Sequence, residues 1–288
     1  MKYAVIDIGS NSVRLLLWAD GCSLCKTVLT TRLGEGISFS PRLLPQAMER
    51  TVAVISELLQ KAQEFGAVKI YAFATAAVRS AENGQDFIHT VYENCGIKPE
   101  ILSGEEEAEV GYLGALEGRD GGIVDVGGAS SEITIGKSGK IIYAVSADVG
   151  AVRLKDVCGE DKQKLKNYID EKISVYGTVP CCPMTLIGGT ATSLAALEYG
   201  VEPYDPKVIH HSTLTAERIG YWAEKLLSMK QSERLLLKGM DRKRADILGG
   251  GAMLLYEILK KIRAEKVSVS ETDNTEGYLM KKLRGESK

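Results

Sequence analysis

The sequence predicts an α/β protein built from two domains of similar plan, and three observations support this. A strand–turn–strand pattern near the N-terminus, Asp7-Ile-Gly-Ser-Asn-Ser, recurs as Asp125-Val-Gly-Gly-Ala-Ser, at an offset of 125 − 7 = 118 residues. In each half, β-rich stretches are followed by alternating helical and β-rich stretches. The 288 residues are enough for two domains that each bury a core. We therefore expect domains at residues 1–120 and 121–288, facing each other across a central cleft.

Composition narrows the class of protein. The hydrophobic content of 44% and charged content of 26% are typical of globular proteins in water. A formal net charge of −2 provides no global basic field for nucleic acid. No apolar run approaches the length that spans a membrane, and Met1 leads directly into a strand rather than a signal peptide. Among the six cysteines, Cys22 and Cys25 have CxxC spacing, but no second pair lies at the distance of a zinc site. We therefore expect reduced thiols in a cytoplasmic protein with no nucleic-acid or membrane partner.

The first half reads as three antiparallel strands followed by alternating helices and strands. Apolar residues recur at helical spacing between Leu44 and Ala62, and Gly66 stands where a C-terminal cap is expected. Ser103 is a typical helix N-cap. The predicted strands are 2–8, 13–19, 24–32, 68–74 and 97–102, and the predicted helices are 43–65, 85–94 and 103–116.

The second half repeats this plan. Ser138-Gly139 has the composition of a hairpin turn between two of its strands. The last helix belongs to this half in sequence but could pack back on the first domain. The predicted strands are 121–126, 131–136, 140–146, 184–187 and 267–270, and the predicted helices are 161–176, 190–198, two within 215–240, 244–264 and 276–283.

Three glycine-rich turns are candidate phosphate-binding sites. Glycines remove the side chains that would keep a ligand from the backbone N–H groups, and serine hydroxyls add donors. Two acids, Asp125 and Glu132, flank the second turn and would repel a bare phosphate, so a divalent cation is expected between acids and phosphate. The third turn opens a helix, whose N-terminus favours anions. The candidate residues are Gly9, Ser10, Asn11, Ser12 and Arg14, then Gly127, Gly128, Ser130 and Ser131, and then Gly188, Gly189 and Thr190.

Two further features suggest catalysis. Glu105, Glu106 and Glu107 begin a helix, where acids complement the helix dipole, but one of them could instead be a general base in the cleft. We favour Glu107 for that role. Arg79 follows a strand and a run of small residues, and its guanidinium could bind a phosphate and stabilise developing charge.

Together these motifs resemble the exopolyphosphatase / guanosine pentaphosphate phosphohydrolase (Ppx/GppA) family, in order from residue 7 to about residue 250. The resemblance implies two ribonuclease-H-like domains of the actin/Hsp70/sugar-kinase superfamily, in the short two-domain form. The matching stretches are Asp7-Ile-Gly-Ser-Asn-Ser-Val-Arg14, Ala74-Thr-Ala-Ala-Val-Arg79, Ser103-Gly-Glu-Glu-Glu-Ala108, Asp125 to Glu132, Gly150-Ala-Val-Arg-Leu154, Ile187-Gly-Gly-Thr-Ala-Thr-Ser193 and Arg244-Ala-Asp-Ile247.

The resemblance also implies roles for individual residues. Glu107 matches the catalytic glutamate that activates water, and Arg79 would contact the phosphates. Asp125 and Glu132, with help from Asp7, would hold Mg²⁺ or Mn²⁺. The second turn of the family usually reads Gly-Gly-Gly-Ser-Thr-Glu, whereas here Ala129 takes the third position, which forbids some glycine-only backbone angles.

The implied activity is hydrolysis of the terminal phosphoanhydride of inorganic polyphosphate. The alternative substrate is the 5′-phosphate of guanosine pentaphosphate. More distant alternatives are a nucleotide-dependent phosphotransferase and a non-catalytic polyphosphate-binding or actin-like protein. The sequence leaves open the preferred chain length and whether the protein forms a homodimer.

Overall fold

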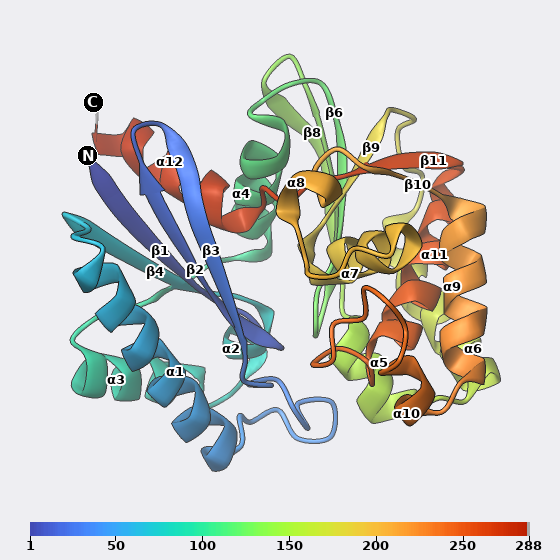
Figure 1. Cartoon of the computed structure of the whole chain (residues 1–288), viewed down its shortest axis with the longest axis horizontal. Helices are drawn as coiled ribbons and strands as arrows, with labels where there is room; N and C mark the ends of the chain where they lie inside the picture. Colours follow the sequence, from blue (N-terminus) through green and yellow to red (C-terminus); the bar gives the residue numbers. More distant parts are fainter. Residues whose placement is uncertain (287–288) are drawn as a thin grey trace. The chain divides into compact units, whose positions relative to one another are not determined.

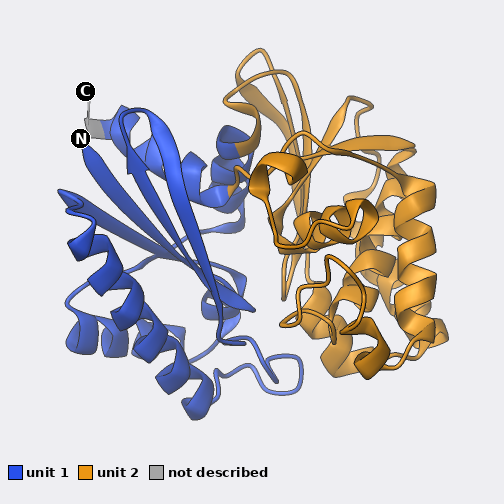
Figure 2. Cartoon of the chain, in the orientation of Figure 1, with its two compact units in different colours: residues 1–114, 274–288 blue, residues 115–273 orange. Residues whose placement is uncertain are grey.

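The computed structural model describes residues 1–286 of the chain, which divides into two compact α/β units (Figures 1 and 2). Unit 1 contains residues 1–114 and the C-terminal segment that begins at Asn274, and unit 2 contains residues 115–273. No helix within residues 1–286 is both long and apolar enough to cross a membrane. The predicted cleft concerns the placement of one unit relative to the other, and it stays a prediction.

Unit 1 is a five-stranded sheet with helices on both faces. The strand order is β3-β2-β1-β4-β5, with β1 antiparallel to β2 and parallel to β4. Its elements are β1 (Lys2–Ile8), β2 (Ser12–Ala19), β3 (Cys22–Thr30), α1 (Pro45–Glu64), β4 (Lys69–Ala74), α2 (Ala76–Ser80), α3 (Gly84–Cys95), β5 (Glu100–Ile101), α4 (Gly104–Leu116) and α12 (Asn274–Glu286).

Alternation along β1 separates the two faces of this sheet. Ala4, Ile6 and Ile8 pack with buried residues of α1 and α3. Val5 points the other way, into a core that includes Val110 of α4 and residues of α12. Asp7 follows Val5 at a spacing of two, so it lies on the face that α4 covers. Asp7 and helix α4, which contains Glu105, Glu106 and Glu107, therefore lie on the same face of the sheet.

The C-terminal helix α12 belongs to unit 1, the arrangement that the sequence analysis allowed for the last helix although it follows the second domain in the chain. Two contacts illustrate how it is held there. The ring of Tyr278 lies 4.6 Å from that of Phe73. Glu276, which is 1% exposed, pairs with Lys26 of β3 at 2.7 Å. These long-range contacts join residues about 200 positions or more apart in the chain, and local sequence patterns do not encode them.

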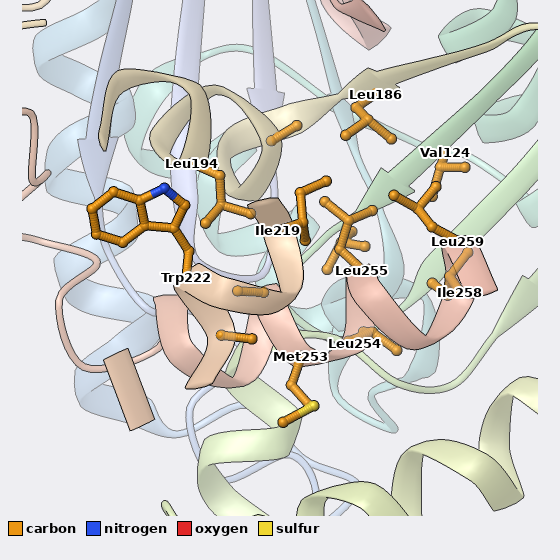
Figure 3. Close-up of a cluster of buried hydrophobic side chains, with 14 of the residues drawn as sticks. Val124, Leu186, Leu194, Ile219, Trp222, Met253, Leu254, Leu255, Ile258 and Leu259 are labelled. Atoms are coloured by element: carbon orange, nitrogen blue, oxygen red, sulfur yellow. The ribbon is translucent and has the colours of Figure 1, made fainter. Parts of the chain in front are cut away.

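Unit 2 has a six-stranded sheet in the order β10-β11-β9-β6-β7-β8. Its large apolar core packs β6, β7 and β9 against α7, α9 and α11, as Figure 3 shows for Val124, Leu186 and Leu255. Its elements are β6 (Gly121–Val126), β7 (Ser131–Lys137), β8 (Lys140–Ala147), α5 (Ala151–Cys158), α6 (Lys162–Ile173), the 3₁₀ helix η1 (Ser174–Tyr176), β9 (Met184–Ile187), α7 (Gly188–Tyr199), α8 (Pro206–Ile209), β10 (Thr213–Thr215), α9 (Ala216–Ser228), α10 (Gln231–Arg234), α11 (Leu248–Ile262) and β11 (Lys266–Val269).

The internal duplication is confirmed by strand order and register. Removing the extra edge strand β10 leaves β11-β9-β6-β7-β8, the counterpart of β5-β4-β1-β2-β3. Asp7 pairs with Arg14 across β1 and β2, and Asp125 pairs with Glu132 across β6 and β7. Both pairs therefore sit at the same register position, because 132 − 14 and 125 − 7 both equal 118. The two halves present different charges at this position.

Several elements differ from the sequence-based expectation. The strand expected at 97–102 is reduced to β5, and the helix expected from Arg244 begins at Leu248 after a series of turns. The short helices α2, α5 and α8 and the strand β10 were not predicted. The clearest physical reason is found at α5, where the first amides donate to carbonyls of a turn more than twenty residues earlier. Such a tertiary contact can start a short helix that its own sequence would not sustain.

Candidate active site

The structure gives the three consecutive glutamates at the start of α4 different environments. Glu106 and Ser103 form a capping box, in which Glu106 N donates to Ser103 Oγ (3.1 Å) and Ser103 N donates to Glu106 Oε2 (2.9 Å). Glu105 is exposed. Glu107 alone is buried, with 8% of its surface exposed. The helix-end interpretation therefore accounts for Glu106 but not for Glu107.

Arg79 holds the buried Glu107 carboxylate. Arg79 Nη1 donates to Glu107 Oε2 (2.7 Å) and to the carbonyl oxygen of Leu102 (2.9 Å). Arg79 and Glu107 are 28 positions apart in the sequence, and the fold brings their side chains into direct contact. Within residues 1–286, Nε and Nη2 of Arg79 have no hydrogen-bond partner, so this guanidinium keeps donors for a ligand.

Burial raises the pKa of Glu107 above its ordinary value, because desolvation disfavours the charged form. The positive charges of Arg79 and Arg14 act in the opposite direction and lower it, but burial dominates. A carboxyl group whose pKa is raised above its ordinary value, and which a guanidinium holds in one orientation, has the properties of a general base.

The first turn, residues 9–12, is closed by a hydrogen bond from Gly9 N to the carbonyl of Ser12 (3.1 Å). A side-chain carbon added to Gly9 would lie 3.1 Å from that same oxygen, which is a tight contact. Asn11 Nδ2 donates to Ser12 Oγ (3.0 Å), and the Asn11 carbonyl accepts from the amides of the loop at 31–32. The side chains of Asn11 and Ser12 thus bond to each other, while Arg14 Nη1 lies 3.4 Å from Asp7 Oδ2.

The second turn, residues 127–130, is closed in the same way, with Gly127 N donating to the Ser130 carbonyl (3.0 Å). The next three amides, of Gly128, Ala129 and Ser130, have no hydrogen-bond acceptor within residues 1–286. Successive free amides in a turn form an anion-binding concavity. Ala129 has no positive φ, so its backbone does not adopt the left-handed conformation that favours glycine.

Helix α5 supports the second turn from behind. Ala151 N donates to the carbonyl of Gly127 (2.9 Å), and Val152 N donates to that of Gly128 (2.8 Å). Gly150 permits this approach, since a side-chain carbon there would lie 2.5 Å from the Gly128 backbone. The amides at the start of α5 thus hold the carbonyl groups of the second turn in place. The free amides of the second turn are thereby fixed in position for a ligand.

The carboxylates of Asp125 and Glu132 are suited to a magnesium ion. The two residues pair directly across antiparallel strands, so their side chains share one face of the sheet. Ser146 Oγ on β8 donates to Glu132 Oε1 (2.7 Å) and orients it. Mg²⁺ is commonly held by one or two carboxylates, water and substrate phosphates. Within residues 1–286 no cluster of three or more His, Cys, Asp or Glu side chains forms a metal site, and the third predicted ligand, Asp7, lies beside Arg14.

Ser131, predicted to bind phosphate, is turned into the core. It is 0% exposed, and its hydroxyl lies 2.8 Å from the hydroxyl of Tyr176, which also donates to the Ser131 carbonyl (2.8 Å). Its contacts are those of a structural residue. Ser130 has no such side-chain bond within the described residues and remains beside the free amides.

The third turn contacts other site residues. A side-chain carbon on Gly188, which has φ of +80°, would lie 2.3 Å from Asp125 Oδ1. One on Gly189 would overlap the guanidinium of Arg244, 2.1 Å from Nη2. Thr190 Oγ1 donates to the carbonyl of Val126 (2.9 Å). The glycines of the third turn therefore leave room for the side chains of Asp125 and Arg244. Its binding of phosphate stays a prediction.

The sequence pointed to no role for Ser146, Tyr176 or Arg244, and it marked Arg153 only as one of four arginines, with Arg14, Arg32 and Arg79, that are candidates to contact a polyanion. Ser146 and Tyr176 have ordinary strand and helix contexts, so only the fold shows that they contact Glu132 and Ser131. Arg244 lay within a recognised motif, which was the one available signal for it.

A model of the Ppx/GppA phosphatase family matches residues 22–286. The chain belongs to the Ppx/GppA phosphatase family. Among Ppx/GppA relatives, it is 29% identical to exopolyphosphatase 2 of Mycobacterium tuberculosis, over 97% of this chain and 98% of that protein. It is 24% identical to the guanosine-5′-triphosphate,3′-diphosphate pyrophosphatase of Photobacterium profundum, over 98% of this chain and 60% of that protein.

Solved Ppx/GppA structures share the fold over nearly the whole chain. The Aquifex aeolicus family member has a TM-score of 0.81 and is 29% identical. Its match includes 100% of this chain and 99% of that protein. An exopolyphosphatase from Cytophaga hutchinsonii has a TM-score of 0.87 and is 25% identical, and its match includes 99% of this chain and 98% of that protein. These similarities confirm the predicted family and the predicted α/β fold class.

Proposed function

We propose that this Ppx/GppA protein is an exopolyphosphatase, which hydrolyses the terminal phosphoanhydride bond of inorganic polyphosphate. The observation that carries the proposal is the buried Glu107 carboxylate held by Arg79, because a water-activating base needs a raised pKa and a fixed orientation. The free amides of the second turn supply donors for phosphate oxygens. The similarity to mycobacterial exopolyphosphatase 2 over nearly the full length of both chains supports the same substrate class.

In the proposed mechanism, Glu107 takes a proton from the attacking water as its oxygen bonds to the terminal phosphorus. The anhydride P–O bond breaks in line, and the shortened polyphosphate leaves with the bridging oxygen. Arg79 keeps Glu107 oriented and offers its remaining donors to the phosphates. Asp125 and Glu132 would hold Mg²⁺ or Mn²⁺, which would supply positive charge to offset that of the phosphates.

The substrate is tested by measuring phosphate release from long-chain polyphosphate, tripolyphosphate, guanosine pentaphosphate and ATP under the same conditions with Mg²⁺. We expect the highest kcat/KM for polyphosphate. A higher kcat/KM for guanosine pentaphosphate would replace the proposal with the second family activity. Absence of phosphate release from all four compounds would overturn the hydrolase assignment.

The metal site makes a separate prediction. Asp125→Asn and Glu132→Gln should each raise the Mg²⁺ concentration needed for half-maximal activity by about tenfold or more, because each removes one of two carboxylates. Ser146→Ala should change it in the same direction but less, since it removes only the hydrogen bond that orients Glu132. Calorimetric titration of Mg²⁺ provides a readout independent of turnover. Unchanged affinity in both carboxylate variants would exclude this pair as the metal site.

The pH dependence follows from the pKa of Glu107. A base must be ionised, so kcat/KM should fall as the pH is lowered through a pKa that lies above the ordinary glutamate value of 4.5. Arg79 lowers this pKa, so Arg79→Gln should move the acidic limb of the profile to higher pH. The measurement is a pH–rate profile of wild type and variant. An acidic limb that does not move would show that Glu107 is not the titrating base.

A further inference from the structure

Helix α5, which holds the second turn, also contains a partly buried arginine, Arg153, whose side chain contacts that turn. Arg153 lies in the first turn of α5, and its backbone amide donates to the carbonyl of Gly128 (3.0 Å). Its side-chain Nε donates to the carbonyl of Ala129 (2.9 Å). The backbone amide and the side-chain Nε of Arg153 are therefore both bonded to the second turn, whose own amides are free.

The terminal nitrogens of Arg153, Nη1 and Nη2, have no hydrogen-bond or ion-pair partner within residues 1–286. Arg234, in the same unit, uses Nη1 for Glu160 and the Ala245 carbonyl, and Nη2 for the Met229 carbonyl. Arg153 thus keeps a planar pair of donors, the geometry that matches two oxygens of a phosphate.

Negative charge near the second turn would oppose phosphate binding there, and the positive charge of Arg153 would offset it. Asp125 and Glu132 flank the turn, and their negative charges oppose a polyanion at the amides. A metal ion between the carboxylates would offset part of this repulsion. A guanidinium anchored through Nε on the same turn adds a fixed positive charge, and the anchoring limits the side-chain entropy lost on binding.

We propose that Arg153 is a phosphate-binding residue of the active site, which contacts a phosphate group of the substrate at the second turn through Nη1 and Nη2. This inference rests on the proposed function, in which that turn binds the phosphates of polyphosphate. It also gives a role to the carbonyl of Ala129, the position at which this turn departs from the three-glycine pattern.

The alternative is that Arg153 is only a clamp for the turn, and binding of inorganic orthophosphate distinguishes the two. Calorimetry with orthophosphate and Mg²⁺ measures affinity without turnover. We expect Arg153→Gln to weaken orthophosphate binding by about 10–100-fold, the loss expected for charge-assisted hydrogen bonds, with little change in Tm. Arg153→Lys should be intermediate, because a point charge replaces a two-donor fork. Lys164→Gln, on an exposed side chain of α6, removes the same charge and should leave affinity unchanged.

A clamp predicts a different pattern: a lower Tm in Arg153→Gln with orthophosphate affinity like that of wild type, and this result would overturn the proposal. If Arg153→Gln does not fold, Arg153→Lys decides, and wild-type affinity in it counts against phosphate binding. Equal weakening by Lys164→Gln would show a general charge effect and would also overturn it. Failure of the proposed function is seen separately, as wild-type protein that binds orthophosphate but releases none from polyphosphate.

Discussion

Replacing Glu107 with glutamine is expected to lower kcat for polyphosphate hydrolysis by about 10²–10⁴-fold, the usual contribution of a general base. Glutamine keeps the shape of the side chain and can still accept the hydrogen bond from Arg79, but it cannot take a proton from water. The lost interaction exists mainly in the transition state, so the effect belongs in kcat and polyphosphate binding should be nearly unchanged. The measurements are steady-state kinetics and equilibrium binding.

The two neighbouring glutamates provide matched controls. Glu105→Gln removes an exposed charge, and Glu106→Gln weakens a capping box, worth about 0.5–2 kcal/mol of stability at most. Both should keep kcat within a few-fold of wild type. If all three variants retain near-wild-type kcat, Glu107 is not the base and the mechanism proposed for it is wrong.

Folding stability separates a catalytic effect from a structural one. The folded-state pKa of Glu107 is raised, so its contribution to stability is full below the ordinary pKa of 4.5 and is lost as pH rises through the folded pKa. In its ionised form, Glu107 thus lowers folding stability, and substitution by glutamine removes this destabilisation. We expect the thermal stability of Glu107→Gln at pH 7 to equal or exceed that of wild type, with any gain shrinking toward pH 4. Loss of both activity and stability would indicate a structural role.

Replacing Gly277 with alanine is expected to destabilise unit 1 by about 3 kcal/mol or more, the upper range for inserting atoms into a packed interior. Gly277 lies where α12 crosses α4. A side-chain carbon there would lie 1.7 Å from the carbonyl oxygen of Val110 and 2.7 Å from the amide nitrogen of Gly114. These are backbone atoms, so no rotamer change can relieve the overlap and the two helices must separate. Urea or thermal unfolding measures the loss.

The same helix carries the control for this substitution. A side-chain carbon added to Gly285 would have nothing within 4 Å, so alanine there meets no obstacle. Gly285→Ala should leave stability unchanged or raise it by up to about 1 kcal/mol through helix propensity. Equal stability of the two variants would show that α12 and α4 do not need the close approach at Gly277.

How much of the fold followed from sequence is clearest at the duplicated turns. The positions of Asp7 and Asp125, the strand on each side of them and the 118-residue offset all follow from the sequence, because strand and turn signals are local. The short helix α5 does not, and for α12 the sequence left open on which domain it packs. Both depend on contacts between residues far apart in the chain, such as Ala151 with Gly127 and Tyr278 with Phe73.

The candidate site divides along the same line. The sequence by itself determined which residue types were present at the turns, and therefore the family, the acids Asp125 and Glu132, and the choice of Glu107. Only the tertiary structure decided their environments: burial and Arg79 distinguish Glu107 from Glu106, Tyr176 turns Ser131 inward, and Arg153 is fastened to Ala129. A side chain's pKa, partners and free donors arise from groups that folding brings together, and residue order along the chain does not state them.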